Sequence, residues 1–436
     1  MLRKRKSTCF CATFASGLTI KQHSALVSGD SGVSSQRSIE LQRMNVFKLQ
    51  FVLMVAIGLS GCASLVTEYI QHADGFDYGN IASEEEIALL GFDEGRYCSP
   101  KIELCISYLS GGKINARRLK YETETKLGES STKVTLNLNR DSVPIELNGT
   151  VVLFHGFRAS KEFMLNTALY FRFLGFDVLV PDLLGHGESD GEKAYGVGDR
   201  HIIDELISSK HDPEEKLFLL GNSMGAVTAA YLSKMRPDVD GIILQAPMLR
   251  FDEAVLRYTK ANHPYLTSIL SDDTIISGSL RALSEANLTV IDTDIHRVIS
   301  TSSTPLLLFA SSSDPVAPYD QFEHMSSAAT TVKDLPNRNH PSMSVVGDES
   351  SKIIINWLNE LTSKASGNNL GRLSLREVGE SGELKLQDYF LSGMKAATNL
   401  SDKVDSCIKT QAERRAEIAG DPQTIDPESL SLPEES

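Results

Sequence analysis

Short apolar segments alternate with amphipathic ones through the middle of the chain, from about residue 150 to residue 361. Apolar runs bounded by polar residues are typical of buried strands, whereas Phe163 to Phe173 and Ile353 to Leu361 have the spacing of helices. The predicted strands are 150–154, 176–180, 217–220, 241–245, 305–309 and 331–335. Strands that alternate with helices predict a mostly parallel sheet covered on both faces. Active sites in such sheets lie beyond the carboxyl ends of the strands.

Other segments flank or interrupt this series. Ser83 to Leu90 has the pattern of a short capped helix, and Thr132 to Leu138 alternates like a strand. We therefore place the main domain at 132–363 and a lead-in region at 62–131. Residues 248–303 stand between two predicted strands and contain many large apolar side chains, which indicates a helical insertion.

The run Gly221-Asn222-Ser223-Met224-Gly225 joins an apolar strand to a segment of small residues. This G-x-S-x-G pattern is typical of a nucleophile elbow, in which the serine stands exposed on a sharp strand-to-helix turn. The glycines let neighbouring backbone approach where a Cβ would clash. The N-terminus of the following helix favours developing negative charge. Ser223 is therefore the candidate nucleophile, and a plain serine in a turn is the alternative.

A serine hydroxyl attacks only when a base takes its proton and a third group orients that base. Asp314 comes shortly after the predicted strand 305–309, and His340 comes shortly after 331–335. Both positions lie on loops at the carboxyl ends of strands, and the chain order Ser, Asp, His is the one that this architecture uses. The weaker alternatives are Asp320 and Asp334 for the acid, and His296 and His324 for the base.

The negative charge that develops on the substrate needs two backbone N–H groups, which form an oxyanion hole. Met224 follows the nucleophile and supplies one of them. The other is expected from the loop after strand 150–154, where Phe157 is the candidate. His155 and His186 lie in neighbouring loops, and we interpret both as structural histidines.

These residues resemble the α/β-hydrolase superfamily, in particular its monoacylglycerol lipase and lysophospholipase-like branch. The resemblance rests on Phe-His-Gly at 154–156, on Asp-Leu-Leu-Gly-His-Gly-Glu-Ser-Asp-Gly at 182–191, and on the elbow at 221–225. It covers Asn148 to Leu361. It implies an α/β-hydrolase fold, with a mostly parallel doubly wound sheet and a short helical cap over 248–303.

By this resemblance Ser223 is the nucleophile, His340 the general base and Asp314 the residue that orients it. The cap is expected to cover the nucleophile and shape the acyl pocket, with ordinary helix packing as the alternative for its apolar side chains. Asn222 stands where histidine is commoner in this branch, and no glycine precedes His340. The cap has no obvious long lipid-binding helix, which leaves the substrate open.

Residues 44–61 have the plan of a secretory signal, with a lightly basic start, an apolar core and small residues at the end. The ending Leu-Ser-Gly-Cys at 59–62 resembles the lipobox of bacterial lipoproteins, which implies acylation of Cys62 and a stable lipid anchor. Ala63 after this cysteine resembles lipoproteins sorted to the outer membrane, where the protein would face the periplasm. An uncleaved transmembrane helix over 49–67 is the alternative.

The charge of the chain is unevenly distributed. Residues 1–61 hold eight Lys or Arg against two Asp or Glu, although the whole chain carries a net charge of −14. We interpret 1–43 as a non-native or disordered extension, with translation starting at Met44; a long n-region or a transit peptide is the alternative. The acidic remainder argues against a nucleic-acid partner, because phosphate binding needs a basic face. The polar, acidic segment 364–436 is expected to be partly disordered.

Two of the six cysteines, Cys98 and Cys105, lie close together in the sequence. They could close a small loop as a disulfide in an oxidising compartment, and two free thiols are the alternative. No Cys or His spacing suggests a metal site, and the predicted chemistry needs no cofactor.

The sequence therefore predicts a membrane-anchored serine hydrolase that acts on carboxylic esters, with lipid-derived small molecules such as monoacylglycerol or lysophospholipid as substrates. A peptidase or thioesterase is an alternative, because related hydrolases use the same triad on amides and thioesters. A non-catalytic surface interaction protein is a further alternative, with the acidic C-terminal segment as its working part. A binding role gives no physical reason for serine, aspartate and histidine in this order, which favours the enzyme.

Overall fold

The computed structural model describes residues 63–72, 82–128, 130–143, 147–365 and 384–385, all of which belong to one compact unit, Leu59–Ser436. The predicted extension 1–43, the signal at 44–61, Cys62 and nearly all of 364–436 lie outside the described residues. Within the described ranges, no helix has both the length and the apolar character needed to cross a bilayer.

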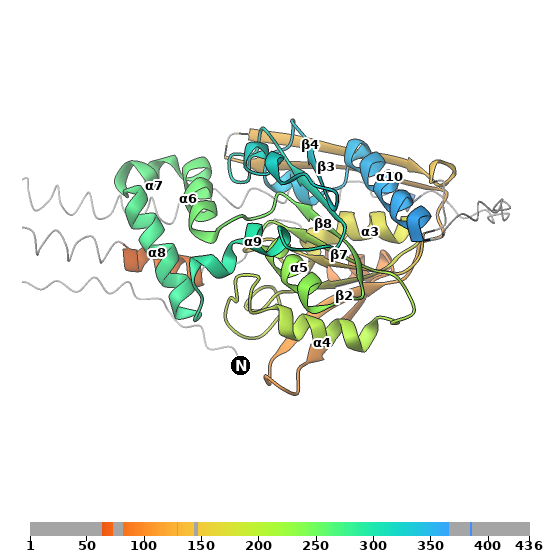
Figure 1. Cartoon of the computed structure of the whole chain (residues 1–436), viewed down its shortest axis with the longest axis horizontal. Coiled ribbons are helices and arrows are strands. Elements are labelled where there is room, and N and C mark those ends of the chain that lie inside the picture. The colour runs from red at the N-terminus through yellow and green to blue at the C-terminus, as the bar shows by residue number, and fades with distance from the viewer. Residues whose placement is uncertain (1–62, 73–81, 129, 144–146, 366–383, 386–436) are drawn as a thin grey trace, which may run out of the picture. The chain divides into compact units, whose positions relative to one another are not determined.

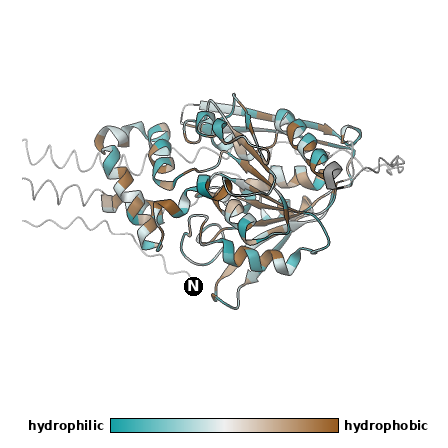
Figure 2. Ribbon diagram, in the orientation of Figure 1, coloured by the Kyte–Doolittle hydropathy of each residue, from teal (hydrophilic) through white to brown (hydrophobic). Residues whose placement is uncertain are grey.

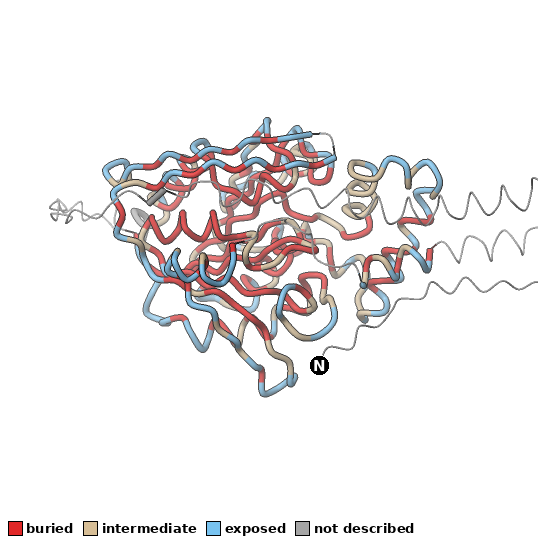
Figure 3. Tube along the Cα trace, turned by 180° about the vertical axis from the view of Figure 1, so that it is seen from behind, coloured by how far each residue is buried: buried red, intermediate tan, exposed pale blue. Residues whose placement is uncertain are grey.

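The described part of the chain contains an eight-stranded main sheet with the order β1-β2-β6-β5-β7-β8-β9-β10. From β6 to β10 in this order, neighbouring strands pair in parallel. These strands are β5 (Thr150–Phe154), β6 (Asp177–Pro181), β7 (Leu217–Asn222), β8 (Val239–Gln245), β9 (Leu306–Ala310) and β10 (Thr330–Asp334). The predicted parallel sheet is confirmed, with each strand within two residues of its predicted ends. The apolar runs predicted these strands correctly because both faces of the central strands are buried (Figure 3).

Two further strands, β1 (Asp93–Cys98) and β2 (Cys105–Gly111), extend the main sheet beyond β6. They form an antiparallel hairpin, and β2 also pairs antiparallel with β6. A disulfide joins Cys98 to Cys105 at the end of this hairpin. The sheet thus begins ahead of residue 132, where the sequence placed the start of the main domain. The sequence missed β1 because most of its side chains are exposed at the sheet edge, so it shows no apolar run.

The segment predicted as a strand at 132–138 belongs to a separate sheet. It lies in β4 (Ser130–Asn139), which pairs antiparallel with β3 (Arg118–Leu127), and β3 also pairs with the short β11 (Leu384–Lys385). Buried and exposed residues alternate along both long strands. One face of this β3–β4 hairpin therefore packs on the main domain while the other faces solvent.

Helices cover both faces of the main sheet (Figure 1), with α3 and α10 on one side and α4, α5 and α9 on the other. Their bounds are α2 (Glu84–Leu89), α3 (Leu165–Leu174), α4 (Arg200–Lys210), α5 (Met224–Met235), α9 (Ile295–Ile299) and α10 (Asp348–Ala365). Short 3-10 helices lie at η1 (Arg140–Ser142), η2 (Lys161–Met164), η4 (Tyr319–Gln321), η5 (Glu323–Met325) and η6 (Pro341–Ser344). The predicted helices at 83–90, 163–173 and 353–361 correspond to α2, α3 and α10, and α4 was not predicted.

The insertion between β8 and β9 is helical. It contains α6 (Phe251–Asn262), α7 (Pro264–Ile269), α8 (Asp272–Glu285) and η3 (Val290–Thr293), and the chain returns to the sheet through α9. Figure 2 shows these helices with mixed apolar and polar faces, in contrast to the apolar strands of the sheet. A further helix over 63–72 packs against α8, as described below.

Candidate active site

Ser223 stands at the junction of β7 and α5, with φ 50° and ψ −112°. This backbone conformation is strained for a residue with a side chain, and such strain persists only where the surroundings impose it. A Cβ on Gly225 would overlap the carbonyl oxygen of Phe154, and a Cβ on Gly221 would overlap backbone atoms of Gly225 and Ala226. The two glycines of the motif therefore allow the close packing of β5, β7 and α5 that holds the serine in place.

Asp314, His340 and Ser223 form a continuous hydrogen-bonded line. Nδ1 of His340 lies 2.7 Å from Oδ2 of Asp314, and Nε2 of His340 lies 3.0 Å from Oγ of Ser223. A carboxylate oxygen only accepts hydrogen bonds, which places the ring proton on Nδ1 and leaves Nε2 free to accept from the serine hydroxyl. This geometry suits a general base that removes a proton from a nucleophile.

The carboxylate of Asp314 is fixed on both oxygens. Its side chain is fully buried, whereas that of His340 is 13% exposed. Oδ1 accepts hydrogen bonds from the backbone N–H groups of Val316 (2.8 Å) and Ala317 (3.2 Å). Only Oδ2 is therefore directed at His340, so the imidazole ring is oriented by a rigid partner.

The alternative acid and base residues are not part of this line. Asp334 accepts a hydrogen bond from the N–H of Ser312, and Asp320 is exposed. The rings of His296 and His324 lie against each other, with centroids 5.6 Å apart. Among the described residues, no cluster of three or more His, Cys, Asp or Glu side chains could hold a metal ion.

The amides of Met224 and Phe157 are positioned as candidate oxyanion donors. Met224 is the first residue of α5, and Phe157 lies in the loop after β5. That loop approaches the nucleophile closely, because a Cβ on Gly156 would lie 3.3 Å from Cβ of Ser223. In the described part of the chain, neither amide N–H donates a hydrogen bond to another group. Both donors are therefore free for a substrate oxygen.

Asn339, the residue before His340, attaches the loop after β10 to the β3–β4 hairpin. Asn339 Nδ2 donates to the carbonyl of Thr125 (3.1 Å), and Asn339 Oδ1 accepts from Oγ1 of Thr125 (3.0 Å). The amide of Asn339 also donates to Oγ1 of Thr132 (3.3 Å). The hairpin therefore supports His340 from outside the main sheet.

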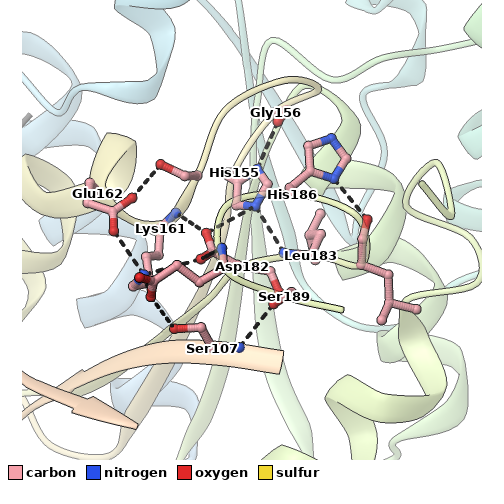
Figure 4. A network of polar contacts seen from close by, with 12 residues as sticks. Ser107, His155, Gly156, Lys161, Glu162, Asp182, Leu183, His186 and Ser189 are labelled. Carbon is pink, nitrogen blue, oxygen red and sulfur yellow. Dashed lines mark hydrogen bonds and ion pairs between the residues drawn. The ribbon is translucent and has the colours of Figure 1, made fainter. Parts of the chain in front are cut away.

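Beside the loop after β5 that contains Phe157, here called the oxyanion loop, a network of charged side chains surrounds the buried Lys161 (Figure 4). Nζ of Lys161 lies 3.2 Å from Asp182, 2.9 Å from Glu162 and 2.9 Å from Glu188, and its side chain is only 1% exposed. The backbone N–H of Lys161 donates to the other oxygen of Asp182. Burial alone would lower the pKa of Lys161, but the carboxylates of Asp182 and Glu162 outweigh it and raise that pKa. The charged ammonium thereby ties the loop after β5 to the loop after β6.

His155 and His186 form hydrogen bonds in these same loops after β5 and β6. His155 accepts a hydrogen bond from the N–H of Leu183 at Nε2 (3.0 Å), and its Nδ1 lies 2.8 Å from the carbonyl of Gly156. Nδ1 of His186 lies 3.0 Å from the carbonyl of Leu184. Burial lowers the pKa of His155 and lowers that of His186 to about 3. Both rings are neutral near pH 7 and join backbone segments together.

The insertion meets the site through an aromatic cluster. The ring of Phe157 stacks on Tyr195 (centroids 6.2 Å apart) and contacts Phe251 of α6 edge-on (5.7 Å). Tyr195 and Phe251 also contact each other, with centroids 4.7 Å apart. The side chain of Phe157 thus joins the oxyanion loop to the first helix of the insertion. This cluster could not be predicted from the sequence, because its members come from two separate loops and the helix α6.

Residues 145–272 match a family model described as serine aminopeptidase, S33. The match includes Ser223 and ends before Asp314 and His340. The match and the order of the main sheet identify an α/β-hydrolase fold.

Curated relatives are similar to parts of the chain. The chain is 32% identical over 110 residues to epoxide hydrolase 3 of Siraitia grosvenorii. The aligned part covers 24% of this chain and 35% of that protein. The chain is 33% identical over 148 residues to caffeoylshikimate esterase of Arabidopsis thaliana, covering 31% and 43%. The chain thus spans less than half the length of these relatives. A solved structure of the Pyrococcus furiosus esterase Pf2001 is 15% identical with a TM-score of 0.44, covering 66% of this chain and 98% of that one.

Proposed function

We propose that this protein is a serine hydrolase that cleaves carboxylic esters through an acyl-enzyme. The observation that carries this proposal is the hydrogen-bonded line from Asp314 through His340 to Ser223, with both contacts at 3.0 Å or less. The match to a hydrolase family model and the similarity to a plant esterase support the same reaction class.

The reaction follows from these positions. Oγ of Ser223 attacks the acyl carbon while Nε2 of His340 takes its proton, and Asp314 stabilises the imidazolium that forms. The negative oxygen rests on the N–H groups of Met224 and Phe157. His340 then gives its proton to the departing alcohol, and a water molecule repeats these steps on the acyl-enzyme to release the acid.

The substrate class and location are further parts of the proposal. Acylation of Cys62 would hold the domain at a membrane, and on the outer membrane it would face the periplasm. A lipid-derived ester such as monoacylglycerol or lysophospholipid suits an enzyme in that position. Feeding cells an alkyne-tagged fatty acid tests the anchor: label on the wild type that is absent from Cys62→Ser supports it. Label on both proteins would contradict acylation at this residue.

A peptidase is the second candidate, because the matched family model is described as a serine aminopeptidase. A panel of p-nitrophenyl esters, a thioester and aminoacyl p-nitroanilides distinguishes an esterase from a peptidase. Ester turnover without release from the anilides supports the esterase, and preferential release from an anilide supports the peptidase.

Labelling with a fluorophosphonate tests the shared mechanism. The full chain is compared with Ser223→Ala and His340→Ala, and circular dichroism confirms that each variant is folded. Label on the wild type that is lost in both variants supports a working serine–histidine pair. A folded wild type that takes no label, or a Ser223→Ala variant that still takes it, would overturn the proposed mechanism.

A further inference from the structure

The helix over 63–72 bridges the insertion and the oxyanion loop. On one side, Oγ1 of Thr67 donates to the carbonyl of Gly278 in α8 (3.0 Å), and Nε2 of Gln71 donates to Glu285 at the end of α8 (2.6 Å). A Cβ on Gly278 would overlap the side chain of Val66, so the two helices pack closely. The 63–72 helix is therefore seated firmly on the insertion.

The opposite side of this helix contacts the loops around the active site. Nζ of Lys193 donates to the carbonyl of Gln71 (2.9 Å), and Nη1 of Arg158 donates to the hydroxyl of Tyr69 (2.8 Å). The guanidinium of Arg158 also lies over the Tyr69 ring, 5.6 Å from its centroid. Arg158 is only 8% exposed, so water screens this contact little. Arg158 directly follows Phe157, the candidate oxyanion donor.

Arg158 adopts a backbone conformation that needs outside support. The N–H of Ala159 donates to the carbonyl of Gly156 (3.1 Å), which closes a four-residue turn with Phe157 and Arg158 at its centre. Arg158 has φ 63°, a value that a turn usually assigns to glycine or asparagine. A residue with a side chain adopts this conformation only at an energetic cost, because its Cβ crowds the neighbouring carbonyl oxygen. Such a conformation persists only when surrounding contacts fix it.

We infer that Tyr69 and Arg158 are positioning residues that hold the Phe157 amide in place for the oxyanion. This inference rests on the proposed function. By fixing the guanidinium, the Tyr69 hydroxyl stabilises the left-handed conformation at Arg158 and so the direction of the preceding N–H groups. Burial raises the pKa of Tyr69 against the opposing charge of Arg158, so the hydroxyl stays neutral and can accept the hydrogen bond near pH 7. Tyr69 thereby links the helix that follows Cys62 to the loop that contains Phe157.

A double-mutant cycle on the full chain tests this inference. Tyr69→Phe removes only the hydroxyl, while Arg158→Asn removes the guanidinium and keeps a residue that tolerates positive φ. Because misplacing a donor costs less than deleting it, we expect each single variant to lower kcat for a p-nitrophenyl ester by about tenfold, with KM changed by less than about threefold. The double variant should lose no more than Arg158→Asn alone, because Tyr69 acts on the turn through the guanidinium that Arg158→Asn removes.

Thr67→Val is the matched control, since it removes a hydrogen bond of the same helix without touching the turn. Its kcat should stay within about twofold of wild type. Values of kcat for Tyr69→Phe within that same range would overturn the inference, as would full additivity in the double variant.

Hydrogen exchange supplies a readout that needs no turnover. Peptides covering residues 155–163 should exchange faster in Tyr69→Phe than in wild type or Thr67→Val, because the turn is less constrained. A wild type without hydrolytic activity, together with faster exchange in Tyr69→Phe, would refute the proposed function but keep the role of the contact. Unchanged exchange would refute that role, whatever the activity.

Discussion

Replacing Asp314 by asparagine should disable the base while leaving the fold intact. Oδ1 of Asp314 accepts two backbone hydrogen bonds, from Val316 and Ala317. In Asp314→Asn, the amide oxygen must take that position, because the NH₂ group would otherwise face two N–H donors. The NH₂ group is then directed at Nδ1 of His340, which can no longer carry its proton there. The ring proton moves to Nε2, so the imidazole cannot accept from Ser223.

The size of the effect follows from this wrong tautomer. In the serine protease triad, the same change of aspartate to asparagine lowers kcat by about 10⁴-fold with the geometry intact. A loss of this size corresponds to about 5.5 kcal/mol of transition-state stabilisation. Because Asp314 is fully buried and its backbone contacts lock the amide orientation, we expect the full effect here. The change in unfolding free energy should be far smaller, since both backbone donors keep an acceptor.

The assay measures kcat and KM for a short-chain p-nitrophenyl ester, together with thermal unfolding. Asp334→Asn is the matched control, because Asp334 ends the neighbouring strand β10 and accepts a hydrogen bond from Ser312, outside the line from Asp314 to Ser223. It should retain wild-type kcat within about twofold. A folded Asp314→Asn variant that keeps more than about a tenth of wild-type kcat would refute the tautomer argument.

Three further perturbations test the surroundings of the site. Lys161→Met leaves the buried carboxylate of Asp182 without its ammonium partner and should lower the unfolding free energy by about 3–5 kcal/mol. Urea denaturation measures this loss. Combining Lys161→Met with Asp182→Asn should recover part of it. Because burial lowers the pKa of folded His186 to about 3 from about 6.5 when unfolded, its contribution is complete above pH 6.5 and is lost as the pH falls toward 3. The stability advantage of wild type over His186→Asn should therefore shrink by about 2 kcal/mol between pH 7 and pH 5, and a pH-independent difference would contradict this. Gly225→Ala places a methyl group against the carbonyl oxygen of Phe154 and should cost about 1–3 kcal/mol in unfolding free energy, whereas unchanged thermal stability would show that the packing is looser than described.

The sequence located the strands of the parallel sheet well because their signal is local. Each apolar run is short, bounded by polar residues and buried on both faces, so its position can be read without knowledge of its neighbours. Strands β1, β2 and β3 and helix α4 were not predicted, and β1 in particular shows no apolar run because most of its side chains are exposed. The strand at 132–138 was recognised by its alternation, but alternation does not say which sheet a strand joins.

The candidate triad was also accessible from the sequence. The elbow glycines, the chain order, and the position of Asp314 and His340 after two strands follow from how a parallel sheet gathers its carboxyl ends. The same reasoning favoured Asp314 and kept Asp334 as a weaker alternative, because both lie near the ends of neighbouring strands. Of these two carboxylates, Asp314 is the one that the structure places within hydrogen-bond distance of His340.

Motif and periodicity alone thus determined the sheet, the elbow and the residues from which a triad could form. The tertiary structure decided which side chains hold those residues in place: Asn339 on Thr125, Lys161 on Asp182, and Arg158 on Tyr69. Two of these contacts join residues 214 and 89 positions apart. Such contacts depend on how separate segments pack in three dimensions, and a one-dimensional pattern contains no record of that packing.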